Sequence, residues 1–144
     1  MKIVRILGLL IAGAGVGGGA AYGTSLVLGP PAPTSGKPAP EPTAFVPAGP
    51  LLVPVTFPDG RLSGYVRVSL QIEVAEEEVD ALTARVPLLL HAANMRTYLA
   101  PLASGPDGLI PDVALLRRVL AEAAAAAWGK AAVKSVAITG VEPV

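Results

Sequence analysis

The sequence predicts a small α+β domain that follows one membrane-spanning helix and a proline-rich linker. Three observations lead to this prediction: an uncharged, largely apolar stretch near the start, a proline-rich run, and a remainder with alternating patterns before and after helical ones. We divide the 144 residues into a cytoplasmic N-terminus at 1–5, a transmembrane helix at 6–28, a periplasmic linker at 29–44 and a periplasmic α+β domain at 45–144.

Composition narrows the class of protein. The 11 basic and 11 acidic residues give a net charge of zero, so no overall field attracts the chain to nucleic acid. The absence of cysteine excludes disulfides, thiolate metal sites and a lipoprotein anchor. We therefore expect no nucleic-acid partner and no cysteine chemistry.

The first segment has the length and charge distribution of a membrane anchor. Lys2 and Arg5 open the chain, and no further charge occurs before Lys37. As a helix, residues 6–28 would extend about 35 Å, which is enough to cross a bilayer core with a modest tilt. The basic residues precede the apolar stretch, so the N-terminus is expected in the cytoplasm and the rest outside it.

A cleaved signal peptide is the alternative interpretation of the same segment. The apolar run from Ile6 to Ile11 is short, and the small residues Ala20 and Ala21 would suit a cleavage site. We favour the retained anchor, because cleavage there would leave the apolar residues 26–28 on a soluble chain. Both interpretations place the remainder of the chain outside the cytoplasmic membrane.

Glycines in the predicted anchor follow a spacing that favours close helix packing. Gly13 and Gly17 are four residues apart, as are Gly15, Gly19 and Gly23. Such small-xxx-small faces let helices approach closely in lipid, so the anchor would pack on itself or on another membrane helix. Because the chain holds 16 glycines, simple abundance explains the spacing equally well.

The linker at 29–44 is dominated by proline. This composition favours an extended, semi-stiff spacer that holds the next domain away from the membrane. A tether without any length requirement fits the composition as well.

The domain opens with a predicted hairpin. Leu51, Val53, Val55 and Phe57 share one face of a strand, and Pro54 favours an edge position, because proline donates no ladder hydrogen bond. The stretch "FPDGR" predicts a type I turn. The second strand lies in "YVRVSLQIEVAEEEVDAL", where strict alternation predicts one buried face and the glutamates then mark a helix start.

Helices and a closing strand complete the predicted domain. Apolar residues at three- and four-residue steps follow Val79, and Pro87 predicts either one kinked helix or two helices. Met95, Leu99 and Leu102 extend this apolar stripe. After a loop at "SGPDGLIPD", Pro111 and Asp112 begin another helix that stops at Gly129. Val136 and Ile138 then mark a closing strand, with Gly140 as a bulge.

No pattern in the sequence predicts catalysis, a metal site or a bound cofactor. His91 stands alone in an apolar helical run, and the acidic run Glu76–Glu78 is better explained as a solvated helix start than as a cation site. Arg117 and Arg118 are expected on an exposed helix face and are our candidates for a protein interface. Composition and periodicity thus indicate an anchored binding or assembly protein.

Several stretches together resemble the flagellar basal-body-associated FliL family. In chain order they read "FVPAGPLLVPVTFPDGRLSGYVRVSLQIEVA", "ARVPLLLHAANMRTYL", "IPDVALLRRVLAEAAAAAWG" and "VKSVAITGVEPV". With the anchor and the spacer, the resemblance covers nearly the whole chain. Its most telling parts are the strand that passes into an acidic helix start, the proline between helical runs and the terminal strand.

This resemblance implies a single-pass inner-membrane protein whose periplasmic domain is similar to the stomatin-type fold. Members form oligomeric rings around the ion-driven stator units of the flagellar motor and support stator assembly or activity, and hence motility. The implied partners are flagellar stator and basal-body proteins, the lipid bilayer and further copies of the chain.

The chain departs from the family pattern in two places. The stretch "LLLHAAN" after Pro87 is apolar where relatives carry more charge, and the last helix is unusually rich in alanine. These changes fall on the surfaces expected to contact partners. They leave open a divergent paralogue that serves another envelope complex. Two alternatives of other classes have separate grounds: a soluble periplasmic binding protein released by cleavage near Ala20 and Ala21, and an enzyme, which would need a pocket of polar side chains around His91.

Overall fold

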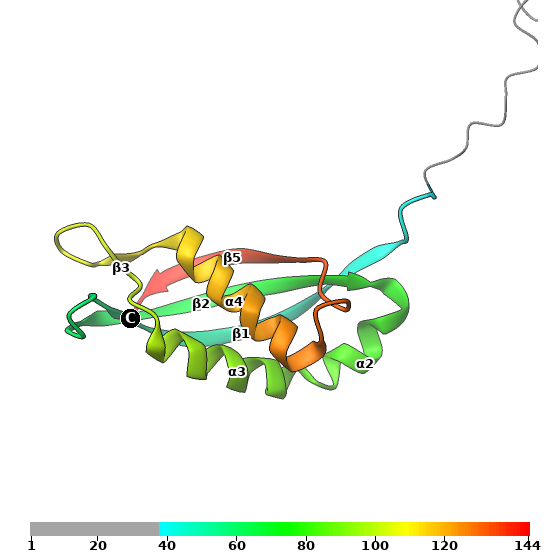
Figure 1. Cartoon of the computed structure of the whole chain (residues 1–144), viewed down its shortest axis with the longest axis horizontal. Coiled ribbons are helices and arrows are strands. Elements are labelled where there is room, and N and C mark those ends of the chain that lie inside the picture. The colour runs from blue at the N-terminus through cyan, green and yellow to red at the C-terminus, as the bar shows by residue number, and fades with distance from the viewer. Residues whose placement is uncertain (1–37) are drawn as a thin grey trace, which may run out of the picture. The chain divides into compact units, whose positions relative to one another are not determined.

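The computed structural model describes residues 38–144, which form an α+β domain with helices packed on one face of a small antiparallel sheet (Figure 1). The predicted fold class of the domain is thereby confirmed. The expected span at 6–28 and its glycines lie outside the described residues. Within residues 38–144, no helix is both long enough and apolar enough to cross a membrane.

The elements follow the order strand, strand, helices, strand. In chain order they are β1 (Thr43–Thr56), β2 (Leu62–Ala75), η1 (Glu76–Glu78), α2 (Val79–Thr83), α3 (Val86–Leu99), β3 (Ala103–Ser104), β4 (Ile110–Pro111), α4 (Val113–Trp128) and β5 (Ser135–Pro143). The main sheet has the order β1-β2-β5, and β3 and β4 form a separate two-stranded pair. Strand β2 is therefore central and pairs antiparallel with both neighbours.

The predicted alternation of β2 is confirmed. Its helix-facing residues are all buried: Val66, Val68, Leu70, Ile72 and Val74. Arg67 and Ser69 on the opposite face are exposed, and Glu73 is half-buried. The period of two thus places one face of the central strand in the core and leaves the other face open to solvent.

Strand β1 is an edge strand, as Pro54 predicts, but it is longer than the apolar pattern indicates. It begins at Thr43 and continues past Pro47 to a bulge, where the register shifts between Ala48 and Leu51. Prolines are tolerated along this strand because only one of its sides pairs with β2. The turn at "FPDG" forms as expected, with the Gly60 amide donating to the Phe57 carbonyl at 2.9 Å.

Of the two alternatives at Pro87, the structure shows two helices. Helix α2 ends at Thr83, and α3 begins at Val86 with Pro87 in its first turn. Proline is accommodated there because the first amides of a helix have no intrahelical acceptor.

The predicted apolar stripe of α3 is wrong at two positions. Met95 and Leu99 are 58% and 85% exposed, whereas Leu102 is fully buried. The face of α3 that meets the sheet instead carries Leu89, Ala93 and Thr97 at four-residue steps. Thr97 fits into the core because its hydroxyl donates to the Asn94 carbonyl at 3.0 Å, within the same helix.

Helix α4 has the predicted end but a later start. Pro111 was expected in its first turn and instead pairs in β4, while Asp112 caps the helix by accepting a hydrogen bond from the Leu115 amide at 2.9 Å. The helix stops before Gly129, as expected. The predicted bulge near Gly140 is also confirmed, because the β2–β5 register shifts between Ser69 and Leu70 and leaves Thr139 without a partner.

Candidate protein-binding groove

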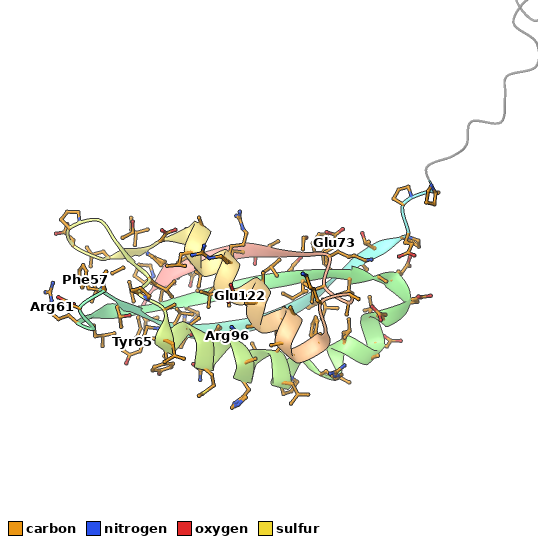
Figure 2. All side chains as sticks on the ribbon, viewed as in Figure 1. Phe57, Arg61, Tyr65, Glu73, Arg96 and Glu122 are labelled. Carbon is orange, nitrogen blue, oxygen red and sulfur yellow. The ribbon has the colours of Figure 1, made fainter. Side chains whose placement is uncertain are left out.

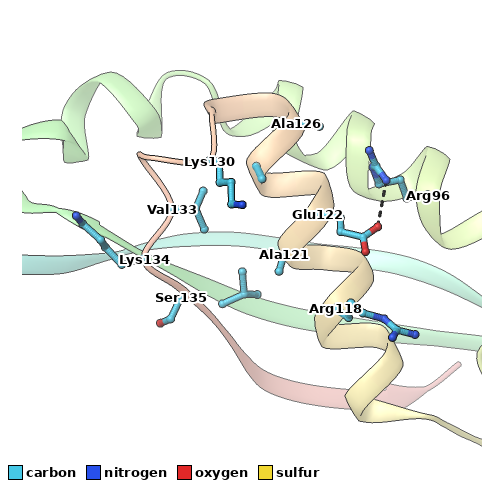
Figure 3. A pocket seen from close by; sticks show the side chains of 11 residues that line it. Arg96, Arg118, Ala121, Glu122, Ala126, Lys130, Val133, Lys134 and Ser135 are labelled. Atoms are coloured by element: carbon cyan, nitrogen blue, oxygen red, sulfur yellow. Dashed lines mark hydrogen bonds and ion pairs between the residues drawn. The ribbon is translucent and has the colours of Figure 1, made fainter.

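A broad hollow lies between α4 and the start of β5 (Figure 3). It is an open groove of about 720 Å³. Its apolar floor is formed by Val133, Val136 and the alanines of α4. An open hollow of this size suits an extended segment better than an enclosed small molecule.

The walls of the groove carry mostly positive charge. Four basic residues line it, from three parts of the chain: Arg96, Arg118, Lys130 and Lys134. Glu122 is the one acidic residue that lines it. The groove therefore has an excess of positive charge in a domain whose acidic residues lie mainly elsewhere.

Two of these basic residues have acidic partners. Arg96 reaches from α3 to the Glu122 carboxylate on α4 at 3.3 Å, and Lys134 lies 3.6 Å from the Glu41 carboxylate. Among the ion pairs of residues 38–144, none includes Arg118 or Lys130. These two side chains are the ones best able to meet an incoming carboxylate.

Helical periodicity explains why α4 presents this wall. Arg118, Ala121, Glu122 and Ala125 follow one another at steps of three, one and three residues, so they share one face of the helix. The alanines keep that face slim, which leaves room between α4 and β5. The opposite face packs into the core through its larger residues Leu116 and Leu120.

A polar contact on the other face of the sheet fixes the start of β5. The Glu73 carboxylate accepts hydrogen bonds from Ser135 Oγ at 2.7 Å and from Thr43 Oγ1 at 2.8 Å, so it joins all three strands (Figure 2). The hydrogen bond from Ser135, then that from Thr43, and the nearby charge of Lys134 lower the pKa of Glu73 below its usual value.

The outer side of β5 is a sheet edge without a strand partner among the described residues. The two edges of the sheet differ in sequence. Strand β1 carries Pro47, Pro50 and Pro54, whereas β5 has no proline before Pro143. Proline is a common device that keeps an edge from pairing with another chain, so β1 is protected in this way and β5 is not.

The candidate residues predicted from the sequence lie in different parts of the chain, and one of them lines the groove. Arg118 lines the groove, and its neighbour Arg117 is exposed on α4 outside it. Gly13, Gly15, Gly17, Gly19 and Gly23 lie outside the described residues. His91 is exposed on α3 and does not line the groove.

The acidic run forms a single 3-10 turn, η1, at the expected helix start. Glu76 and Glu77 border a small hollow of about 140 Å³ together with Glu41. Within residues 38–144, no group of three or more histidine or acidic side chains is arranged to hold a metal ion.

Three groove residues were not predicted from the sequence: Arg96, Lys130 and Lys134. They come from α3 and from the connection between α4 and β5, and nothing in the local pattern of either segment brings them together. Only the spacing of Arg118, Ala121 and Glu122 on α4 offered a signal.

Further exposed apolar residues lie on α3 and at the hairpin end of the sheet. Leu88, Met95 and Leu99 form a stripe along the outer side of α3. At the hairpin end, Leu109 and Ile110 are 68% and 70% exposed. The same end holds the Phe57–Arg61 contact, in which the guanidinium lies 4.7 Å from the ring centroid (Figure 2).

No protein-family model matches the chain, and a search of curated proteins finds no match.

Proposed function

We propose that this chain is a non-enzymatic accessory protein of the bacterial flagellar basal body, anchored in the inner membrane, that supports stator assembly or activity and hence motility. Its N-terminus lies in the cytoplasm and its C-terminal domain in the periplasm. The order of segments carries the proposal: a basic start, an uncharged stretch at 6–28, a proline-rich linker and a small α+β domain.

The described domain supports an assembly role through its surface. It offers a basic groove beside an unprotected strand edge, and an apolar stripe on α3. Surfaces of this kind are typical of proteins that bind other proteins. A protein held on one side of a membrane can use them to collect partners there.

The assignment to the flagellar motor rests on the resemblance to the FliL family. That resemblance supports a stomatin-type fold for the domain, a homo-oligomer as the working state, and flagellar stator and basal-body proteins as partners. The α+β order of elements in the domain is compatible with this assignment.

Deletion of the gene in the bacterium that encodes the chain tests the proposal. We expect a smaller swimming halo in soft agar, with flagellar filaments still assembled, and recovery when the full chain is supplied in trans. A halo of normal size in the deletion strain would contradict the motor role.

The second candidate function is that of a soluble periplasmic binding or assembly protein released by signal peptidase. Ala20 and Ala21 favour it, because small residues at that distance from a basic start suit cleavage. Fractionation separates the two: a full-length chain that leaves the membrane pellet only in detergent excludes the soluble protein.

A further inference from the structure

We propose that an extended acidic segment of a partner protein binds in the groove by adding as a strand to the outer edge of β5. This inference deepens the proposed assembly role, and its expectation of a protein partner rests on that role. The binding itself depends only on the folded domain.

The strand edge supplies the first part of the argument. The Val144 amide donates to the Tyr65 carbonyl at 3.1 Å, which makes these two residues a hydrogen-bonded pair. Alternation along an antiparallel ladder then directs the amide and carbonyl of Val141 away from β2. The main-chain groups of Val141 are thus available to a further strand, whose backbone bonds would supply affinity. The groove lies beside the other end of β5, at Ser135 and Val136, so a strand that uses both must run along the length of β5.

The groove supplies the second part, which concerns the chemistry of the partner. The side chains of a strand added to β5 would alternate between the two faces of the sheet. Those on the helix side would point toward Arg118 and Lys130 on and after α4. Carboxylates on that side, near the start of β5, would therefore meet these cations, with Lys134 and Arg96 also lining the groove.

The chain's own N-terminal segment does not fit this description. Residues 1–40 contain no acidic residue, and their three charges, Lys2, Arg5 and Lys37, are all positive. These charges would repel the cations of the groove rather than complement them.

A second copy fits less well than a partner protein for a different reason. The acidic run of this chain, Glu76–Glu78, is folded as a 3-10 turn and continues directly into α2. It is not extended, so it offers no free strand. The segment just before β1 reads "PAPEP" at 38–42, and its one acidic residue, Glu41, already lies 3.6 Å from Lys134 of the same chain.

A polyanion or an anionic lipid would satisfy the cations but not the strand edge. Neither has backbone amides and carbonyls that pair with β5. The combination of a free edge and basic side chains on one side of it therefore favours a peptide.

The test is direct binding to the full-length chain purified in a mild detergent. The probe is a fluorescent peptide of about ten residues in which glutamate alternates with threonine and valine, which covers β5 at about 3.3 Å per residue. One control peptide has the same composition with its glutamates in one block. The other keeps the alternation but carries N-methyl groups on alternate backbone amides, which removes donors and leaves the charge unchanged.

We expect the alternating peptide to bind more tightly than both controls, with fluorescence anisotropy as the readout. Binding should weaken strongly at about 1 M salt, where the screening length is roughly 3 Å. The double variant Arg118→Gln/Lys130→Gln should bind about tenfold more weakly, from two exposed ion pairs lost. Arg117→Gln is the matched control, because it removes a neighbouring charge outside the groove and should leave affinity unchanged.

Three results would overturn the inference. Equal binding of the N-methylated peptide would show that no strand is added. Tighter binding of inorganic polyphosphate, or of vesicles that contain phosphatidylglycerol, would assign the groove to a phosphate-bearing ligand. Self-association of the chain that is lost in Arg118→Gln/Lys130→Gln, without peptide binding, would assign it to a second copy. Because no flagellum is involved, normal motility in the deletion strain would leave a positive binding result in place.

Discussion

Gly49 lies in the bulge of β1, and its backbone has a φ of 114°, a conformation that side chains with a Cβ rarely adopt. An added Cβ would stand 3.1 Å from the Val68 carbonyl oxygen, which belongs to the backbone of the central strand. The register of the edge strand therefore depends on glycine at this position.

We expect Gly49→Ala to lower the free energy of unfolding by about 1–3 kcal/mol through backbone strain. Urea denaturation followed by circular dichroism measures the change. Gly64→Ala is the control, because Gly64 has no positive φ and an added Cβ would meet nothing within 4 Å. A Gly49→Ala protein as stable as the control would show that the bulge adapts without strain.

The hydrogen bonds to Glu73 make the free energy of unfolding of the domain depend on pH. Its pKa in the folded domain lies below that of an ordinary glutamate, because Ser135 and Thr43 donate hydrogen bonds to its carboxylate. A group with a lowered folded pKa stabilises the fold fully above its unfolded pKa, and the contribution disappears as pH falls through the folded pKa.

We therefore expect Glu73→Gln to unfold at a lower urea concentration than the wild type at pH 7. The difference between the two should shrink as pH falls from the ordinary pKa of glutamate through the lowered pKa of Glu73. Glu142→Gln provides the comparison, because the ion pairs of residues 38–144 do not include Glu142. If the wild type and Glu73→Gln differ by the same amount at every pH, the hydrogen bonds to the carboxylate do not stabilise the fold.

The N-cap of α4 connects element structure to the groove. Asp112 accepts the hydrogen bond from the Leu115 amide and sets where the helix begins, one turn before Arg118. We expect Asp112→Ala to destabilise the domain by about 1 kcal/mol, whereas Asp112→Ser should retain most of the stability. Thermal unfolding of the three proteins checks the order, and equal melting temperatures would show that the cap makes no contribution.

The elements that sequence predicted well are those in which one local pattern decides the outcome. Alternation over Val66 to Val74 has only one solution on a half-buried strand. Pro87 limited the helical run to one kinked helix or two helices, and the structure shows two, with Pro87 in the first turn of α3. The buried face of α3 was harder to predict. Hydropathy assigns Leu99 to the core and Thr97 to the surface, whereas Leu99 is exposed and Thr97 is buried. Thr97 satisfies its own hydroxyl inside the helix, which hydropathy does not register.

The groove could be predicted only in part for a related reason. The spacing of Arg118 and Glu122 on α4 was present in the sequence, but Arg96 joins them from α3 and Lys134 from the connection to β5. Such a site arises from the crossing of helices over a sheet. It depends on packing distances between elements, which no local period encodes.

At the scale of the whole molecule, the proposed role requires that residues 6–28 stay in the bilayer while the domain folds outside. The stretch has no charge, so a single arginine near its centre should interfere strongly with insertion, at a cost of about 2.5–3.5 kcal/mol. We expect Val16→Arg to reduce the fraction of chain in the membrane pellet and the swimming halo together. Thr34→Arg adds the same charge in the linker and should change neither.

The length of the chain in the membrane pellet and in the soluble fraction distinguishes a retained anchor from a cleaved signal peptide. A retained anchor predicts a full-length chain in the pellet that only detergent extracts, for the wild type and for Thr34→Arg alike. A shorter chain that begins near Ala21 and stays soluble would show cleavage instead, and the domain would then act without a fixed distance from the membrane. In that case the proline-rich linker would place no limit on where the groove meets its partner, and the protein would act as a diffusing binding protein rather than an anchored assembly factor.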